Sequence, residues 1–272
     1  MNPNIPSPHP FPSPTLVSII TPTYNCEKFI AETILSVQAQ TYQNWEMIIV
    51  DDCSTDKTAE IVSSFQEKDS RIKYFHNTTN KGSAISRNIA LQNAKGKWIA
   101  FLDSDDLWHP NKLEKQIEFM KRNNYHFSYT NYCEIDENSK EVGLLISGPK
   151  TITEKMMTAY CWPGCLTVMY NAQEIGLMQS IDIKINEEYS IWIKISKITN
   201  CYLLNENLAK YRKHKDSLSD LSYIRLIKWH YLMFRKSEGK NIIKSILLTI
   251  NNIFFGIIKK IIYRHSYNGY KI

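Results

Sequence analysis

The stretch from residue 98 to residue 106 constrains this chain more than any other. An apolar run, Trp98–Leu102, stops abruptly at three aspartates, Asp103, Asp105 and Asp106. A short apolar run without polar alternation is typical of a strand that is buried on both faces of a parallel sheet. Clustered carboxylates repel one another, so a fold keeps them together only around a cation or a hydrogen-bond donor. Their oxygens suit Mg²⁺ or Mn²⁺, and Mg²⁺ usually binds together with phosphate groups. The alternative interpretation is a solvated acidic loop or a helix cap.

Apolar segments alternate with helical patterns over the first hundred residues. Strands are predicted at 16–20, 45–50, 72–75 and 97–102, with amphipathic helices between them. This alternation predicts right-handed crossovers and a parallel sheet. Ligands bind beyond the carboxyl ends of such strands, so Thr21, the pair Asp51–Asp52 and Asp103 are expected to face one crevice. The sequence lacks the glycine fingerprints of dinucleotide folds and P-loops, which leaves a metal to hold phosphates.

The second half of the chain is less regular. We expect Thr21-Pro22 to end the first strand and Lys95-Gly96 to close a helix. Beyond these, the pattern predicts a helix after Pro110, a strand near 127–130, an irregular connection or lid over 131–160, a strand at 165–170, a helix opening at Asn186-Glu187-Glu188 and a short strand at 208–211. The two adjacent carboxylates at that helix start fit either dipole complementation or catalysis.

Both ends of the chain differ in composition from its middle. Residues 1–14 contain six of the ten prolines, which predicts an extended or disordered leader. Residues 223–272 carry ten Lys and Arg against one Glu, whereas the rest of the chain has a balance of −3. This asymmetry favours contact between the tail and an anionic surface, and it argues against a body that binds nucleic acid.

The tail contains an apolar segment, residues 240–264, that is predicted to be helical. Its uncharged run from Ser245 to Ile258 is too short to span a bilayer, which needs about 20 residues. A helix that lies in the interface of an anionic membrane fits better. The alternative is that its apolar faces pack on the rest of the chain or on a second copy.

The cysteines indicate a reducing compartment. The six of them are scattered along a chain that lacks the basic start and apolar core of a secretory signal, which predicts free thiols and a cytoplasmic location.

Taken together, these motifs resemble a bacterial family 2 glycosyltransferase with the GT-A fold. The likeness extends over residues 15–220 in motif order and spacing. Four blocks carry it: Val17–Asn25, Ile49–Asp56, Arg87–Ala90 with Phe101–Asp106, and Glu187–Trp192. A fifth and weaker match lies at Tyr211–Ser219. The resemblance implies an α/β fold with a mostly parallel central sheet. It also implies a catalytic domain over 15–222, with a nucleotide-sugar half (15–106) and an acceptor half (107–222), followed by a helical tail over 223–272.

The resemblance also assigns roles to individual residues. Thr21, Pro22 and Tyr24 would surround the nucleotide base, and Asp51 would accept a hydrogen bond from the imide N–H of uracil. The remaining residues would serve the diphosphate (Arg87), the nucleotide sugar (Asp103 and Ser104), the metal (Asp105, Asp106 and His214) and general-base catalysis (Glu188).

The implied reaction is inverting transfer of a hexose or N-acetylhexosamine from a UDP-sugar, assisted by Mn²⁺ or Mg²⁺. The acceptor would be a hydroxyl of a glycan or lipid-linked sugar in surface-polysaccharide or lipooligosaccharide synthesis, at the cytoplasmic face of the inner membrane. Whether the enzyme forms a homodimer is left open. One departure stands out, because the family usually has Glu-Asp where this chain has Glu187-Glu188. Either Glu188 still reaches the acceptor or Glu187 serves as the base.

Three other functions fit the sequence less well. A sugar-1-phosphate nucleotidyltransferase would need a glycine-rich basic loop after the first strand, and Thr21–Asn25 is neither. A non-catalytic binding or scaffold protein would not need the carboxylates at 103, 105 and 188. An aspartate-based phosphatase normally carries its motif at the end of the first strand.

Overall fold

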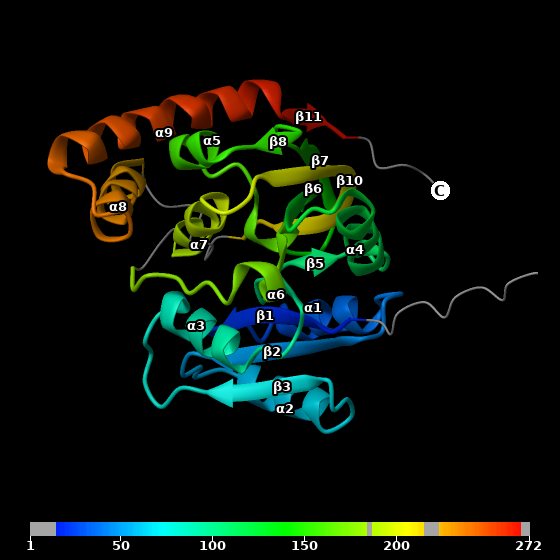
Figure 1. Cartoon of the computed structure of the whole chain (residues 1–272). Helices are drawn as coiled ribbons and strands as arrows, with labels where there is room; N and C mark the ends of the chain where they lie inside the picture. The colour runs from blue at the N-terminus through cyan, green and yellow to red at the C-terminus, as the bar shows by residue number, and fades with distance from the viewer. Residues whose placement is uncertain (1–14, 184–186, 215–222, 268–272) are drawn as a thin grey trace, which may run out of the picture.

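The structure, a computed structural model, describes residues 15–183, 187–214 and 223–267 (Figure 1). Its strands are β1 (Val17–Thr23), β2 (Trp45–Asp51), β3 (Ile72–His76), β4 (Trp98–Phe101), β5 (Leu107–Trp108), β6 (Phe127–Ile135), β7 (Glu141–Ile146), β8 (Thr151–Ile152), β9 (Met169–Asn171), β10 (Cys201–Arg212) and β11 (Arg264–Ser266). Its helices are α1 (Ile30–Gln38), α2 (Thr58–Gln66), α3 (Ser83–Asn93), α4 (Lys112–Asn123), α5 (Glu154–Ala159), α6 (Ala172–Ile175), α7 (Glu187–Ser196), α8 (Tyr223–Lys236) and α9 (Ile242–Ile262), with a 3₁₀ turn at Cys165–Thr167.

All of these strands belong to one eleven-stranded sheet, whose main path runs β11-β7-β6-β9-β4-β1-β2-β3. The β3-β2-β1-β4 part is parallel, as the strand–helix alternation predicts. Beyond β4 the sheet is mixed, because β9 pairs antiparallel with both β4 and β6, while β10 pairs parallel with β6. The expectation of a mostly parallel sheet therefore describes the first half, and the short antiparallel β9 joins it to the second.

Two apolar cores lie on opposite faces of the sheet. Neighbouring residues of one strand point to opposite faces, so Ile19 packs with the core under α1, α2 and α4, and Ile20 with the core under α3 and α7. The second core is closed by Trp192 of α7, whose ring meets the edge of Phe101 at 4.8 Å between centroids. Burial of both faces explains why these strands read as continuous apolar runs.

The first strand is longer than its sequence predicts. β1 continues through Thr21 and Pro22 to Thr23, in register with Val50 and Asp51 of β2. On its other side β4 stops pairing at Ile20, so Pro22 lies where β1 has become an edge strand. A proline there costs no ladder hydrogen bond, which is why it does not end the strand.

The region 131–160 is not an irregular lid. β6 runs on to residue 135 and turns into β7, and β8 and α5 follow. Two polar residues of this region belong to the sheet and are buried: Glu134 of β6, and Asn131, which donates a hydrogen bond to Asn205 (2.9 Å). Likewise β10 spans 201–212 rather than 208–211, with irregularities between Leu204 and Ala209.

Gly96 does not cap α3 in a left-handed conformation. The helix ends at Asn93, and its C-cap residue, Ala94, is already extended. The role of Gly96 is close packing: a Cβ there would lie 2.5 Å from the Ser18 backbone nitrogen. The Pro-rich leader, Asn186 and the segment after His214 fall outside the described residues, so those expectations stay predictions.

Candidate active site

A cavity of about 770 Å³ opens at the carboxyl ends of β1, β2 and β4. Parallel strands end there together, which is why residues far apart in the sequence meet. The sequence-predicted residues that line it are Pro22, Tyr24, Arg87, Asp103, Ser104, Asp105, Asp106, Glu188 and His214. The expected convergence of strand ends on one crevice is therefore present in the fold.

Two of the predicted residues do not line the cavity. Thr21 is fully buried in β1, and Asp51 turns its carboxylate away, toward Ser54 and the Tyr74 hydroxyl (2.8 Å). Thr23 and Asp52 line the cavity at these strand ends instead. Asp52 is the member of the predicted Asp51–Asp52 pair that faces the crevice, whereas Thr23 is not singled out by the sequence because the predicted first strand stops at residue 20.

Hydrogen-bond donors from Asn77, Lys81 and Gly82 hold the carboxylate of Asp52 in place. Its Oδ1 accepts from Asn77 (2.9 Å) and from the Lys81 amide (2.8 Å), and its Oδ2 accepts from the Gly82 amide (2.6 Å). A carboxylate oxygen can accept two hydrogen bonds, so Oδ2 keeps one acceptor position. The Thr23 hydroxyl is also buried and has no hydrogen-bond partner among the described residues. Both groups belong to the cavity wall, and each can still form a hydrogen bond with a ligand.

The acidic loop 103–106 is the most densely charged part of the cavity. Asp105 Oδ2 lies 2.8 Å from His214 Nε2, and the His214 ring packs against Phe29. Asp106 is almost fully buried, and its Oδ2 has no partner among the described residues. Burial raises the pKa of Asp106 well above its ordinary value, and the charges of Asp105 and Asp103 raise it further.

These residues fit a divalent cation, although they do not form a complete metal site. Within residues 15–183, 187–214 and 223–267, no three His, Cys, Asp or Glu side chains form a metal-binding group. Asp105 and His214 nevertheless offer oxygen and nitrogen donors beside the unpaired Asp106 oxygen. Mg²⁺ in particular is usually held by one or two carboxylates together with substrate phosphates, so the donor set suits an ion that arrives with a phosphorylated ligand.

Arg87 joins the two halves of the cavity. Its guanidinium is only 4% exposed and donates to Asp103 Oδ1 (2.8 Å) and to Glu187 Oε1 (2.5 Å), a hundred residues away. Desolvation opposes the charged form, but the neighbouring acidic groups hold the pKa of Arg87 well above its ordinary value. The carboxylate of Glu187 is therefore committed to an ion pair.

Glu188 differs from its neighbour in both position and titration. It lies in the cavity wall at the start of α7, and no side-chain ion pair holds it in the described structure. Burial raises the pKa of Glu188 to about 8, and the charge of Glu187 acts in the same direction. A carboxylate whose pKa lies near neutrality can exchange a proton with a bound ligand.

Comparisons with known proteins identify the family to which this chain belongs. Residues 18–174 match the model of Glycosyl transferase family 2. The chain is 40% identical to the Escherichia coli UDP-Glc:alpha-D-GlcNAc-diphosphoundecaprenol beta-1,3-glucosyltransferase WfgD over 247 residues, which cover 90% of this chain and 94% of WfgD. It is 40% identical to the enzyme of the same description named WfaP, also from Escherichia coli, over 78% of this chain and 83% of WfaP. The chain belongs to glycosyl transferase family 2 and is a glycosyltransferase.

Solved structures of low sequence identity share its fold. Staphylococcus aureus TarS 1–349, in complex with UDP-GlcNAc, aligns with a TM-score of 0.66 at 21% identity, over 86% of this chain and 70% of TarS 1–349. The mannosyltransferase PcManGT from Pyrobaculum calidifontis, in complex with GDP-Man and Mn²⁺, aligns with a TM-score of 0.63 at 18% identity, over 86% and 68%. The fold is GT-A, as the sequence motifs predict.

The Arg87 bridge yields a stability prediction. Arg87→Met leaves the buried carboxylate of Glu187 unpaired, which should destabilise the protein by about 3–5 kcal/mol. The double variant with Glu187→Met removes that unpaired charge and should be less destabilised than Arg87→Met alone. Urea unfolding measures both. Arg122→Met, on the exposed face of α4, serves as the control and should change stability by about 0.5 kcal/mol at most. A double variant as unstable as the sum of the single ones would contradict the pairing.

Proposed function

We propose that this glycosyltransferase moves a hexose or N-acetylhexosamine from a UDP-sugar to a hydroxyl of a glycan or lipid-linked acceptor, with a divalent ion and with inversion. The observation that carries the proposal is the composition of the cavity wall: the acidic loop 103–106 with His214 on one side, and Glu188 with its raised pKa on the other. WfgD and WfaP are named for transfer of glucose from UDP-Glc to a diphosphoundecaprenol-linked sugar, which supports a UDP-sugar donor and a role in surface-polysaccharide synthesis.

The donor base would bind at the ends of β1 and β2. Pro22 and Tyr24 line this part of the cavity, and the free acceptor position of Asp52 Oδ2 suits the imide N–H of uracil. Asp51, the residue that the family resemblance suggests for this contact, already accepts hydrogen bonds from Ser54 and Tyr74. We therefore assign the base contact to Asp52 and regard Asp51 as the residue that shapes the turn behind it.

The diphosphate would lie over the acidic loop. Asp105, His214 and Asp106 would hold Mn²⁺ or Mg²⁺ there. When bound, such an ion neutralises the negative charge that develops on the leaving diphosphate. Asp103, kept in position by Arg87, and Ser104 face the same part of the cavity and would contact the nucleotide sugar.

Glu188 would act as the general base. Its carboxylate takes the proton of the acceptor hydroxyl while the hydroxyl oxygen forms a bond to the anomeric carbon, and the bond from that carbon to the diphosphate breaks. The sugar passes through an oxocarbenium-like state, as in glycoside hydrolysis. A single base on the face opposite the leaving group inverts the anomeric configuration. Glu187 is the less suitable candidate because Arg87 engages its carboxylate.

The tail would bind the cytoplasmic face of an anionic membrane, and the orientation of α9 supports this. Its side facing the protein is a stripe of polar and small residues at three- and four-residue spacing: Ser245, Thr249, Asn252, Gly256 and Lys259. Asn252 lies 3.4 Å from the Tyr189 hydroxyl, and Lys259 donates to the Trp162 carbonyl (2.6 Å). The most deeply buried residues of this helix are thus polar, and Leu248 and Phe255 pack against the core beside them.

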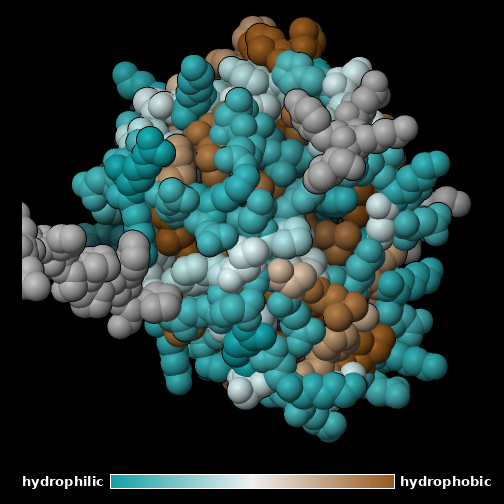
Figure 2. All heavy atoms as spheres, turned by 90° about the vertical axis from the view of Figure 1, so that its right-hand side faces the viewer, coloured by the Kyte–Doolittle hydropathy of each residue, from teal (hydrophilic) through white to brown (hydrophobic). Residues whose placement is uncertain are grey.

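The apolar side of α9 is exposed. Ile243 and Ile261 are 71% and 74% exposed, and large apolar side chains between them are about half exposed: Ile246, Leu247, Ile250, Ile253, Phe254 and Ile257. A small group of hydrophobic side chains lies at the top edge of the molecule in Figure 2, the end at which α9 lies in Figure 1. By length and composition α9 could cross a membrane, but its contacts with α5, α8 and β11 hold it lying along the protein. Such a helix suits an anionic lipid surface, because it carries Lys244 and belongs to a tail with ten basic residues.

The donor site is tested by calorimetry with UDP. Wild type should bind UDP more tightly with Mn²⁺ than without it, and Asp105→Asn should lose that difference because one oxygen ligand is gone. Asp182→Asn, an exposed position, is the matched control and should behave as wild type. UDP binding that is absent, or equal in all conditions, would refute the metal-dependent UDP-sugar function.

The base is tested by Glu188→Gln. The rate of transfer should fall by roughly 10²–10⁴-fold, while UDP binding stays unchanged. For wild type, the raised pKa means that the basic form of Glu188 increases as the pH rises, so kcat/KM should increase up to about pH 8. Glu174→Gln, exposed on α6, is the control. Near wild-type turnover in Glu188→Gln would transfer the role to Glu187.

The membrane surface is tested by co-sedimentation with vesicles that contain phosphatidylglycerol. Ile250→Glu with Ile257→Glu places charges on the exposed face of α9 and should weaken binding at least about tenfold, since each buried isoleucine contributes about 1.5–3 kcal/mol. Leu35→Glu, an equally exposed apolar position on α1, should leave binding unchanged. A wild type that ignores vesicles but dimerises through this face, as shown by gel filtration of the variant, would assign the surface to a second copy instead.

A further inference from the structure

We propose that Arg212 is a positioning residue that fixes the acidic loop 103–106 in the shape required for metal and diphosphate binding. The proposal rests on the metal-dependent function above. Arg212 is the last residue of β10, and its side chain is 0% exposed although it carries a positive charge. Burying a charge is costly, so its partners indicate what the fold gains from it.

Arg212 holds the loop from two directions. Its side-chain Nε donates to the carbonyl of Asp105 (2.7 Å), and its backbone amide donates to Asp106 Oδ1 (2.9 Å). The same residue therefore fixes the main chain of one proposed metal ligand and the side chain of the next. It also lies two residues before His214, whose ring meets Asp105.

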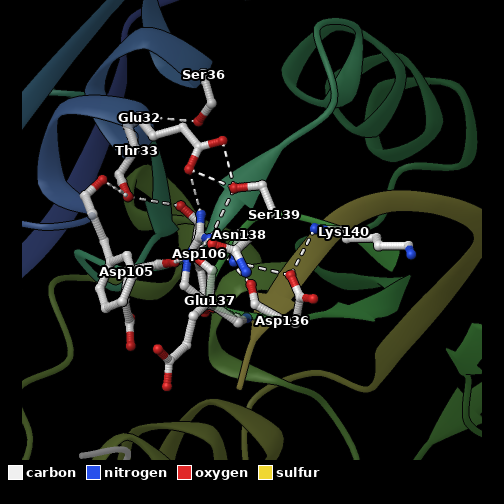
Figure 3. A network of polar contacts seen from close by, with 12 residues as sticks. Glu32, Thr33, Ser36, Asp105, Asp106, Asp136, Glu137, Asn138, Ser139 and Lys140 are labelled. Carbon is white, nitrogen blue, oxygen red and sulfur yellow. Dashed lines mark hydrogen bonds and ion pairs between the residues drawn. The ribbon is translucent and has the colours of Figure 1, made fainter. Parts of the chain in front are cut away.

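The rest of the guanidinium is anchored outside the loop. One terminal nitrogen donates to Ser139 Oγ (2.8 Å) and to the carbonyls of Asp136 and Glu137, in the turn between β6 and β7. The other donates to Glu32 Oε2 (2.6 Å) on α1, which also accepts from Ser139 (2.7 Å). Figure 3 shows Glu32 and Ser139 joined by hydrogen bonds close to Asp106. All five N–H groups of an arginine can be used in such a planar arrangement, whereas a lysine offers three donors from a single point.

The remaining carbonyls of the loop are fixed from α1. Thr33 Oγ1 lies 2.9 Å from the carbonyls of both Ser104 and Asp106, and its one proton is shared between them. Together Thr33 and Arg212 hold the carbonyls of residues 104, 105 and 106, so the main chain of the loop cannot turn without breaking these bonds. Because Arg212 acts through Asp105, Asp106 and His214, its loss should weaken metal binding before it affects the chemical step.

The test is the affinity for Mn²⁺ in the presence of UDP, measured from the free Mn²⁺ signal by electron paramagnetic resonance. Arg212→Lys keeps the positive charge but loses the planar set of N–H donors. It should weaken Mn²⁺ binding by roughly 10–100-fold, the range for residues that orient metal ligands. Glu32→Gln removes the partner charge at a half-exposed position and should weaken it in the same direction by a smaller factor. The matched controls are Arg122→Lys and Glu118→Gln on the exposed face of α4.

A second readout separates positioning from a purely structural role. At saturating Mn²⁺ the kcat of Arg212→Lys should recover to within about threefold of wild type, because the ligands themselves are intact, while the Mn²⁺ concentration for half-maximal rate stays raised. A fall in melting temperature with unchanged Mn²⁺ affinity in the folded variants would overturn the role of Arg212. If Arg212→Lys does not fold, Glu32→Gln and Ser139→Ala decide, and unchanged Mn²⁺ affinity in both overturns the proposal. A wild type whose UDP binding ignores Mn²⁺ would instead overturn the metal-dependent function itself.

Discussion

Mutual repulsion of carboxylates is the constraint on which this site depends. Asp103, Asp105 and Asp106 follow one strand within four residues, and the start of α7 adds Glu187 and Glu188 to the same cavity. Two buried arginines make this concentration of charge tolerable: Arg87 bridges Asp103 and Glu187, and Arg212 lies behind Asp105 and Asp106. What they leave unneutralised faces the cavity, and this residual negative charge is the feature that a divalent ion and its diphosphate can use.

The same two arginines also connect distant parts of the fold. Arg87 belongs to α3 and reaches α7, whereas Arg212 ends β10 and reaches α1 and the loop after β4. Each connects residues about 100 or more apart in sequence. The apolar cores determine which face of the sheet each helix covers, but these polar contacts determine where the walls of the cavity stand relative to one another. A site that needs a donor on one wall and a base on the other depends on this spacing.

The sequence predicts those features of the site that depend on residues close together in the chain, and it misses those that depend on distant partners. Strand ends and the acidic loop are local patterns, so their convergence on one cavity could be predicted, and the motif match located Glu188. The choice between Asp51 and Asp52 depends on the direction of one side chain, which alternates along a strand and is fixed by donors at Ser54, Tyr74 and Gly82. The role of Arg212 was missed because its partners lie up to 180 residues away. The strands within 131–160 are not evident from the sequence because they are fixed by pairing with distant strands, β6 with β10 and β7 with β11, which local composition does not reveal.

The tail reverses the usual relation between pattern and burial. Amphipathic helices of soluble proteins normally turn their apolar side inward, whereas α9 buries a mostly polar stripe, flanked by Leu248 and Phe255, and leaves most of its large apolar side chains exposed. The polar stripe is used: Asn252 meets Tyr189, the residue after Glu188, and Lys259 holds the Trp162 carbonyl close to the cavity wall at Gly164–Leu166. The helix whose large apolar side chains are exposed thus packs on the elements that carry the proposed base, Glu188, and the cavity wall at Gly164–Leu166. One helix therefore links an exposed apolar surface to the walls of the cavity through Asn252 and Lys259.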